Sequence, residues 1–326
     1  MRPCLLLFLL TFAARAQTQS PCCPEKPTTE KQDVLWQKLE AEIKEVDHSL
    51  DGVLGVAIKD LISGRTLFLR PDDVFPQASS IKITVLAELY LQEQQALAGT
   101  ASKAGQMPRL ARLGDLYTVN AGDLVQDSDI LSGLTPGVTR ITNRDLATMM
   151  VAVSDNSATN ILIDHVGMET MNAFLEGLGL RNTRLRRKMM DVKAAGEGRE
   201  NVSTPREMMT LLSHMYSGKV LNPPLTEDFF KMLSTHKDSW IPRDLPDDLR
   251  IANKPGALEG VRNDSGIVFA TKRPFVICVM TTYLHRERDG EEAISKIALA
   301  AYQMFDRLGR ASEYGRVVSP ANSSNH

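Results

Sequence analysis

The spacing of hydrophobic and polar positions changes along the chain and divides it into regions. Apolar residues recur every three or four positions from Leu35 to Leu50, which predicts an amphipathic helix that ends near Gly52. Two short apolar runs, 53–59 and 66–69, follow this helix and predict a β-hairpin. The folded part of the chain is therefore expected to begin with one helix and two strands.

Helical signals dominate the middle of the chain, from about residue 79 to residue 232. Thr142, with Asp145 three positions later, has the capping-box pattern of a helix start. Thr204 is followed by proline and, at the third position, by Glu207, which is a strong start signal for another helix. We therefore expect an all-α region here.

Strand patterns return at about 266–270 and 275–282, and a last amphipathic helix is predicted at about 291–308. Neither group of strands can build a sheet with a core by itself. Joined across the helical region, they form one antiparallel sheet that the terminal helices cover. The sequence therefore predicts a mixed α/β (α+β) fold with an all-α insertion.

This organisation gives the expected domain boundaries. We assign 32–75 and 235–312 to the sheet domain and 76–234 to the all-α domain. Residues 17–31 are polar and contain proline, so we expect a flexible leader, and 313–326 is expected to be a C-terminal tail.

The first residues have the pattern of a secretory signal. Arg2 precedes a continuous apolar run, 4–12, and 14–16 reads Ala-Arg-Ala, the small-x-small pattern of a cleavage site. The run is much shorter than the roughly 20 residues that a membrane span needs. We expect 1–16 to be a signal peptide, and the mature protein to be secreted or periplasmic without a stable membrane span.

Composition and charge exclude some classes of protein. The 326 residues are 43% hydrophobic and 24% charged, with a formal net charge of −2 and a pI near 6.3. These proportions are typical of a globular protein and give no reason to expect nucleic acid as a partner. We expect a monomer that binds a small molecule.

The cysteines and histidines indicate neither a set of disulfide bonds nor a metal site. Cys4 leaves with the signal, Cys22 and Cys23 lie in a proline-rich stretch, and Cys278 lies in an apolar run where it is expected to be a buried thiol. Lipidation at Cys22 stays open. The six histidines include no clustered ligand pattern, so no metal and no cofactor are expected.

The first chemical motif is the pair Ser79 and Lys82, which lie three positions apart at a predicted helix start. Residues at this spacing share one helix face, so the hydroxyl and the amine can meet. A helix N-terminus and burial both lower the pKa of a lysine, which can then act as the base that activates a serine. An isolated match of this kind is more often a capping serine and a solvated lysine.

Two further motifs are equally weak when each is taken alone. Ser154 and Asn156, in a Ser-Asp-Asn triplet, offer a hydroxyl that can pass a proton and an amide that can bind a carbonyl, but such triplets are usually turns. Lys254 and Gly256 precede a predicted strand. The lysine can attract a carboxylate, and the glycine lets a ligand approach the backbone.

Together the three motifs resemble the signature set of class A β-lactamases and related penicillin-binding proteins, because they occur in the same order, about 70 and 100 residues apart. The resemblance covers residues 32–308. It implies a β-lactamase/transpeptidase-like fold with a five-stranded antiparallel sheet. It also implies a serine hydrolase that opens the β-lactam amide through an acyl-enzyme, with no metal.

The resemblance also implies a role for each catalytic candidate. Ser79 would attack the lactam carbonyl and become acylated. Lys82 would assist its deprotonation, and Ser154 would pass a proton to the leaving nitrogen.

The substrate-binding candidates follow from the same resemblance. Asn156 would hold the side-chain amide of the substrate, and Lys254 would bind its carboxylate. Gly256 lies between Lys254 and Ala257, and the backbone N–H groups of Ser79 and Ala257 would form the oxyanion hole.

The sequence departs from the family pattern where a glutamate normally activates the deacylating water. Aligning 183–185 with the family places Met189 at that position, and a thioether cannot accept a proton from water. Asp191, Glu197 or Glu200 could substitute, and the sequence does not choose among them. General-base assistance is typically worth about 10²–10⁴-fold, so we expect acylation to be faster than deacylation.

A second departure is Pro255, where the family usually has threonine or serine. Proline has neither the hydroxyl nor an N–H group, so the carboxylate of a substrate would be bound more weakly or with the help of Arg262. A plain surface role for Arg262 is equally compatible with the sequence.

Two other functions stay open beside a β-lactamase. One is a D-alanyl-D-alanine peptidase of the penicillin-binding kind, which the missing glutamate favours. The other is a module that is acylated by β-lactams and senses them without turnover. In each case the partner is a β-lactam or a D-Ala-D-Ala-type peptide.

Overall fold

The computed structural model describes residues 30–99, 110–312 and 314–317. Its centre is a five-stranded sheet in the order β2-β1-β9-β8-β7, with every neighbouring pair antiparallel. The first two strands in this order come from the N-terminal part of the chain and the other three from the C-terminal part, where the sequence pattern predicts only two. The strands are β1 (Val53–Asp60), β2 (Thr66–Leu69), β7 (Ile251–Leu258), β8 (Val261–Val268) and β9 (Phe275–Thr282).

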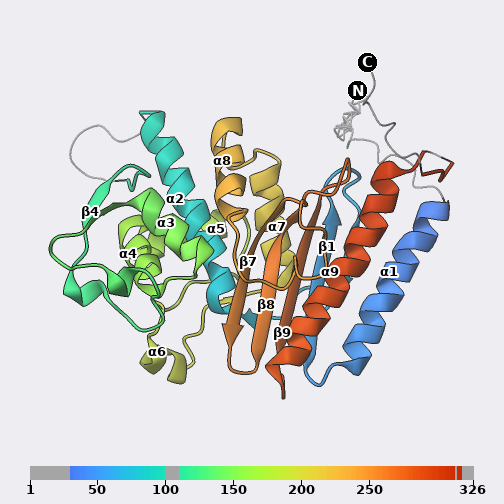
Figure 1. Cartoon of the computed structure of the whole chain (residues 1–326), viewed down its shortest axis with the longest axis horizontal. Helices are drawn as coiled ribbons and strands as arrows, with labels where there is room; N and C mark the ends of the chain where they lie inside the picture. Colours follow the sequence, from blue (N-terminus) through green and yellow to red (C-terminus); the bar gives the residue numbers. More distant parts are fainter. Residues whose placement is uncertain (1–29, 100–109, 313, 318–326) are drawn as a thin grey trace, which may run out of the picture.

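Two helices from the chain ends cover one face of the sheet. Figure 1 shows α1 (Glu30–Ser49) and α9 (Glu287–Arg310) side by side along the sheet. Alternate positions of the central strands point to this face, for example Leu54, Val56 and Ile58 of β1, and all three are fully buried. This period of two is what a sheet buried on both faces requires.

The other face of the sheet packs against the helical region. α7 (Pro205–Tyr216) lies on this face, and the remaining helices group beyond β7 (Figure 1). They are α2 (Lys82–Leu97), α3 (Asn143–Ala152), α4 (Asn156–Val166), α5 (Met168–Gly177), α6 (Val192–Gly196) and α8 (Pro223–Leu233). Short strand pairs complete this region: β3 (Phe75–Pro76) with β6 (Val202–Ser203), and β4 (Leu116–Thr118) with β5 (Arg140–Thr142).

Both helix-start signals are confirmed. The Thr142 side chain accepts a hydrogen bond from the Asp145 N–H, and the Asp145 carboxylate accepts one from the Thr142 N–H. The Thr204 side chain accepts from the Glu207 N–H. The Glu207 carboxylate, however, accepts from the backbone N–H groups of Asn182 and Thr183, so it ties the preceding loop to α7 instead of closing a capping box.

The prediction that Lys254 lies just before a strand is wrong. Lys254 lies in the middle of β7, and the next strand begins at Val261, five residues earlier than predicted. The run from 251 to 258 contains Asn, Lys, Pro and Gly, which are poor strand formers. Pairing with β8 decides the conformation here, because local preference is weaker than tertiary contacts.

Several expectations concern the chain ends. The predicted signal peptide, 1–16, and the leader up to residue 29 lie outside the described residues, while Glu30 and Lys31 already belong to α1. Of the tail, residue 313 and residues 318–326 also lie outside the described residues. No helix in the described part of the chain is both long and apolar enough to cross a membrane. Cys278 is a fully buried free thiol, as expected.

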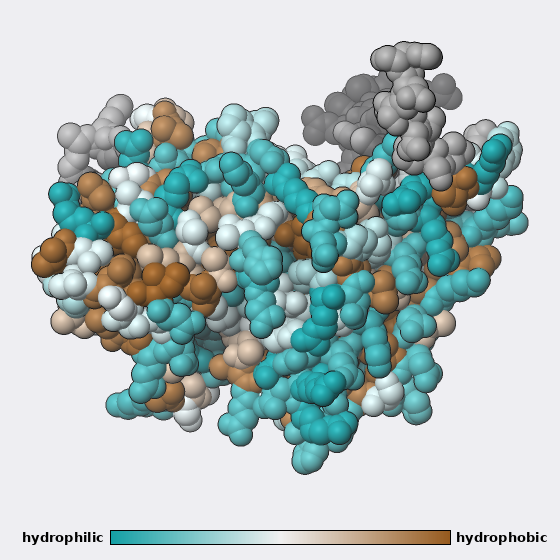
Figure 2. Space-filling model, in the orientation of Figure 1, coloured by the Kyte–Doolittle hydropathy of each residue, from teal (hydrophilic) through white to brown (hydrophobic). Residues whose placement is uncertain are grey.

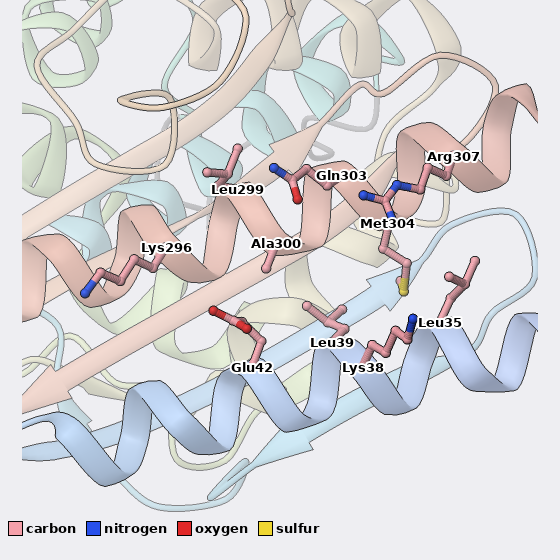
Figure 3. Close-up of a pocket in the computed structure, with 10 residues that line it drawn as sticks. All are labelled: Leu35, Lys38, Leu39, Glu42, Lys296, Leu299, Ala300, Gln303, Met304 and Arg307. Carbon is pink, nitrogen blue, oxygen red and sulfur yellow. The ribbon is translucent and has the colours of Figure 1, made fainter.

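The surface is uneven in polarity. In Figure 2, hydrophobic residues gather over the part of the helical region where Figure 1 draws β4, whereas hydrophilic residues prevail over α9. A groove of about 290 Å³ runs between the terminal helices, with Leu39 on α1 facing Met304 on α9 (Figure 3). None of the three chemical motifs contributes a residue to this groove, so it has no part in the chemistry below.

Helix α2 carries a buried acid that its helical pattern does not predict. Glu88 is 2% exposed; Gln92 Nε2 donates to one carboxyl oxygen at 2.7 Å, and the other oxygen has no hydrogen-bond partner within the described residues. Burial raises the pKa of Glu88 to about 7, although the Gln92 hydrogen bond opposes the shift. The folded protein therefore holds Glu88 as a neutral acid up to about neutral pH.

We predict that Glu88→Gln stabilises the protein at pH 8 by on the order of 2 kcal/mol and has much less effect at pH 4.5. The unfolded glutamate ionises near its usual pKa of 4.5, and the folded one near 7. The free energy of unfolding of the wild type therefore falls as pH rises between these values. A glutamine does not ionise, so the variant keeps this part of the stability. Urea unfolding at both pH values measures the effect, with the exposed Glu45→Gln as control. Equal effects at the two pH values would contradict the assignment.

Candidate active site

Ser79 lies on a short turn that leads into α2. The turn is a 3₁₀ helix, Ala78–Ile81, and Lys82 is the first residue of α2. Residues three apart in a 3₁₀ helix lie one above the other, so Ser79 and Lys82 share a face as predicted. Ser80, by contrast, is fully buried and donates to the carbonyl of Gln77 at 2.6 Å. Of the two adjacent serines, Ser79 is the one with an available hydroxyl.

Buried polar side chains from distant parts of the chain fix this turn. Asn263 on β8 donates from Nδ2 to the carbonyl of Pro76 at 2.6 Å, and the N–H of Gln77 donates to the carbonyl of Asn201. Ala78, next to Ser79, has φ of 48°, a left-handed conformation that alanine rarely adopts. The sheet and the loop before α7 thus hold Ser79 in place.

The Lys82 amine is buried in the wall behind Ser79. Lys82 is 1% exposed, and its Nζ makes three hydrogen bonds: to Ser154 O at 2.6 Å, to Ser154 Oγ at 2.9 Å and to Asn156 Oδ1 at 2.8 Å. The first two motifs, more than 70 positions apart, therefore meet at one nitrogen atom. This contact joins the start of α2 to the loop between α3 and α4.

Burial lowers the pKa of Lys82 well below its usual value, and the charge of Lys254 lowers it further, while Asp155 opposes the shift. A neutral amine has two N–H donors and one lone pair. The two N–H groups can serve the two carbonyl oxygens, and the lone pair can then face the Ser154 hydroxyl. The contacts of Lys82 therefore suit a group that exchanges a proton with Ser154.

The buried side chain of Asp155 anchors the Ser154–Asn156 loop. Its fully buried carboxylate accepts from the N–H of Ala158 at 2.9 Å and from the N–H of Leu131 at 2.9 Å. Ser154 itself has φ of 59°, in the left-handed region. The strained conformation and the buried anchor together turn the Ser154 and Asn156 side chains toward Lys82.

Strand β7 passes directly against the Ser79 turn, and Gly256 is the point of contact. A side chain at this position would place its Cβ 2.6 Å from the carbonyl oxygen of Gln77, 2.7 Å from the nitrogen of Ser80 and 3.0 Å from the nitrogen of Ser79. The first two distances are shorter than real Cβ contacts allow, and the third is very tight. Gly256 is therefore required so that the strand edge and the nucleophile can lie together.

The hydrogen-bond register shows which groups of β7 face the free edge of the sheet. The backbone N–H and C=O of Arg262 face Thr281 of β9, and Arg262 pairs with Ala257 across to β7. In an antiparallel ladder such a pair is not hydrogen-bonded, so the Ala257 N–H points to the open edge. Pro255, two residues earlier, occupies the same kind of position, where its missing N–H costs no ladder bond.

Lys254 lies beside Lys82 and above a buried carboxylate. Burial lowers the pKa of Lys254 to about 7, Lys237 lowers it further, and Asp264 opposes the shift. Asp264 is fully buried and accepts from Asn253 Nδ2 at 2.8 Å, and burial raises its pKa to about 6. The region around Ser79 therefore gathers lysines that are easily deprotonated.

Two open hollows meet at Ser79, and both are also lined by Asp127, Asn156 and Ala257. One, of about 530 Å³, is called the lysine cleft here. The other, of about 440 Å³, is called the methionine cleft. The further lining of the lysine cleft includes Ser154, Lys237, Trp240, Lys254, Pro255 and Gly256, and that of the methionine cleft includes Arg187, Met189, Met190, Glu200 and Leu258. All seven site residues predicted from the sequence are thus found at one place.

Comparison with known proteins gives the family. The model of the β-lactamase enzyme family matches residues 38–305. The chain belongs to the β-lactamase enzyme family. This assignment makes it a hydrolase that acts on β-lactams, and it confirms the class A resemblance inferred from the three motifs.

Individual relatives agree with the family match. The chain is 30% identical to the carbapenem-hydrolyzing β-lactamase KPC of Klebsiella oxytoca, over 81% of this chain and 87% of the relative. It is 27% identical to β-lactamase SME-1 of Serratia marcescens, over 81% and 88%. A solved structure of an ancestral class A β-lactamase superposes with a TM-score of 0.72 at 26% identity, covering 82% of this chain and all of that one.

Met189, which the sequence alignment places at the position of the family's glutamate, lies in the same cleft as Ser79. It is 7% exposed and lines the methionine cleft with Ser79. Asn160, one helical turn after Asn156, accepts from the Met189 N–H at 2.8 Å and donates to the Met189 carbonyl at 3.1 Å. Both backbone groups of Met189 are therefore fixed toward α4, and its thioether contributes an apolar wall.

The three carboxylates that could replace a base differ in their surroundings. Asp191 is exposed and accepts from the N–H of Ala194 as the N-cap of α6. Glu197 is exposed and pairs with Arg199. Glu200 is the one of the three that lines the methionine cleft, where Arg187 pairs with it at 3.0 Å.

Arg262 does not line either cleft. Its guanidinium pairs with Glu291 at 3.1 Å, donates to the carbonyl of Leu258 at 2.9 Å and lies over the ring of Trp240. The surface alternative considered for Arg262 is closer to what the structure shows, because its donors are already occupied away from Ser79.

Several residues of the site escape sequence analysis. Asn160, Asn263 and Lys237 belong to no motif, and only the folded chain brings them to the site. Asn160 has the one detectable signal, since it lies four positions after Asn156 on the same helix face. Among the described residues, no group of three or more His, Cys, Asp or Glu side chains could hold a metal ion.

We predict that Gly256→Ala lowers the acylation rate by more than about 10-fold without unfolding the protein, because the methyl group would push β7 away from Ser79. The rate of adduct formation with a chromogenic cephalosporin measures it. Gly114→Ala is the control, since Gly114 has open space around its Cβ direction. A Gly256→Ala protein with unchanged acylation would show that the close contact has no functional role.

Proposed function

We propose that this family member is an exported class A-like serine β-lactamase that works through an acyl-enzyme on Ser79 and deacylates slowly. The observation that carries the proposal is the meeting of Ser79, Lys82 and Ser154 with the β7 edge at one cleft. The printed names of the relatives, which include carbapenem-hydrolyzing enzymes, support the substrate class. Export is proposed from the N-terminal pattern of the sequence.

The acylation step uses the groups on the Ser79 turn and behind it. Lys82, kept neutral by burial, removes the proton of Ser79 while the oxygen attacks the lactam carbonyl. The developing oxyanion is held by the N–H groups of Ser79 and Ala257, and the Ala257 N–H points to the open edge of β7 beside the Ser79 turn. As the lactam C–N bond breaks, Ser154 gives its hydroxyl proton to the leaving nitrogen, and the Lys82 ammonium, hydrogen-bonded to Ser154 at 2.9 Å, gives Ser154 the proton taken from Ser79.

The deacylation step lacks an obvious base. Water that attacks the acyl ester from the methionine cleft would meet the thioether of Met189, which accepts no proton. Glu200 lines the same cleft, but its carboxylate is already engaged by the guanidinium of Arg187 at 3.0 Å. The acyl-enzyme therefore accumulates, and water attack limits turnover.

A second function is favoured by this same observation. The natural substrate of a D-alanyl-D-alanine peptidase is a peptide. Such an enzyme does not need to hydrolyse quickly the ester that it forms with a β-lactam. Met189 is therefore compatible with peptide chemistry, and the lifetime of the penicilloyl adduct distinguishes the two.

The nucleophile is tested by replacing Ser79 with alanine. We expect Ser79→Ala to form no adduct with benzylpenicillin and to lose hydrolysis, because the attacking oxygen is removed. Intact-protein mass spectrometry in a time course measures both adduct and decay. The exposed Ser217→Ala serves as control. Hydrolysis that survives in Ser79→Ala would mean that another group is the nucleophile.

The missing base is tested by restoring one. We expect Met189→Glu to deacylate about 10²-fold faster than the wild type, because the held backbone would present a carboxylate to the cleft. Met189→Gln has nearly the same size and polarity but accepts no proton, so it should remain slow. If both variants release penicilloate at the same rate, Met189 does not mark the place of the base.

A further inference from the structure

Two lysines line the lysine cleft, and each makes one hydrogen bond from Nζ among the described residues. Lys254 is 2% exposed, and its Nζ makes one long hydrogen bond, 3.3 Å, to the carbonyl of Pro255. Lys237 follows α8, and its Nζ donates to the carbonyl of Leu233 at 2.8 Å. An ammonium group has three N–H donors. Lys254 therefore has donor capacity that the described residues do not use, and buried donors of this kind favour a hydrogen-bond acceptor.

The carboxylate beneath them is occupied elsewhere. Asp264 accepts from Asn253 Nδ2 and from the backbone N–H groups of Trp240 and Ile241 at 3.1 and 3.0 Å. None of the ion pairs within 4.0 Å in the described part of the chain includes Lys237, Lys254 or Asp264. Asp264 therefore acts on the two lysines through its charge, without a direct ion pair to either.

The surroundings of the two lysines disfavour their positive charges and so favour the binding of an anion beside them. Burial lowers the pKa of Lys237 to about 8, as it lowers that of Lys254 to about 7. Asp127, Asp129 and Asp238 also line the cleft, but all three are exposed to water. An anion placed between two such lysines recovers the charge that burial disfavours.

Resting on the proposed function and on the role expected for Lys254, we propose that Lys237 is a second cation that binds the free carboxylate of the substrate. Lys237 is then a specificity-determining residue that replaces the hydroxyl absent at Pro255. Both lysines line the cleft that Ser79 and Ser154 also line, so a carboxylate held there belongs to a ligand whose carbonyl lies at Ser79. The ligand class is an organic monocarboxylate next to the reacting amide, and the corresponding ester should bind poorly.

The experiment measures non-covalent binding in a Ser79→Ala background, where no acylation occurs. Calorimetric titration with benzylpenicillin and with its methyl ester compares the charged and masked carboxylate. We expect Lys237→Met to weaken benzylpenicillin binding by about 10- to 100-fold and ester binding by less than about twofold. Lys237→Arg should keep most of the affinity for the acid. Lys231→Met, on an exposed part of α8, is the matched control and should change neither.

The outcomes separate three explanations. If Lys237→Met weakens the acid and the ester equally, or only lowers the unfolding temperature, Lys237 merely caps α8 and the inference is wrong. Absence of measurable benzylpenicillin binding in the Ser79→Ala protein also overturns it. If binding of the acid depends on Lys237 while the wild type forms no adduct by mass spectrometry, the carboxylate subsite stands and the proposed reaction fails.

Discussion

The contact between strand β7 and the Ser79 turn is the constraint on which the site depends. Gly256 has no side chain, so the strand can lie against the backbone of residues 77–80. That approach places the Ala257 N–H and the Lys254 side chain at the nucleophile, and it closes the boundary between the sheet and the helical region. A residue with a Cβ at this point would separate the two parts of the molecule.

The sequence predicted the parts of the fold that depend on local pattern. The helix from Leu35 to Leu50 and the Thr204 start followed from apolar spacing and capping, which act over a few residues. Strand β7 was missed because Lys254, Pro255 and Gly256 prefer other conformations, and its pairing partner lies across a hairpin. Short-range rules cannot show a strand that only its neighbour stabilises.

The candidate site was predictable to a similar extent and for similar reasons. Each of the three motifs is defined by particular residue types at a fixed spacing, so Ser79, Ser154 and Lys254 could be named before the fold was known. Lys82 was expected to contact Ser79, yet its three hydrogen bonds go to Ser154 and Asn156. The orientation of Lys82 depends on the loop that Asp155 anchors. The sequence around residue 82 contains no signal of a contact with that loop.

Pro255 has a consequence beyond the chemistry of the cleft. Strand β7 is the last strand of the sheet, and its odd-numbered positions direct backbone groups outward. Its last part, from Pro255 to Leu258, is partly open to solvent, and an open sheet edge is a template on which a foreign strand can extend the sheet, which leads to edge-to-edge association. Proline removes one outward donor in the middle of that edge, so a continuous ladder cannot form along it. The residue that departs from the family motif thus also keeps an otherwise reactive sheet edge from adhering to other strands.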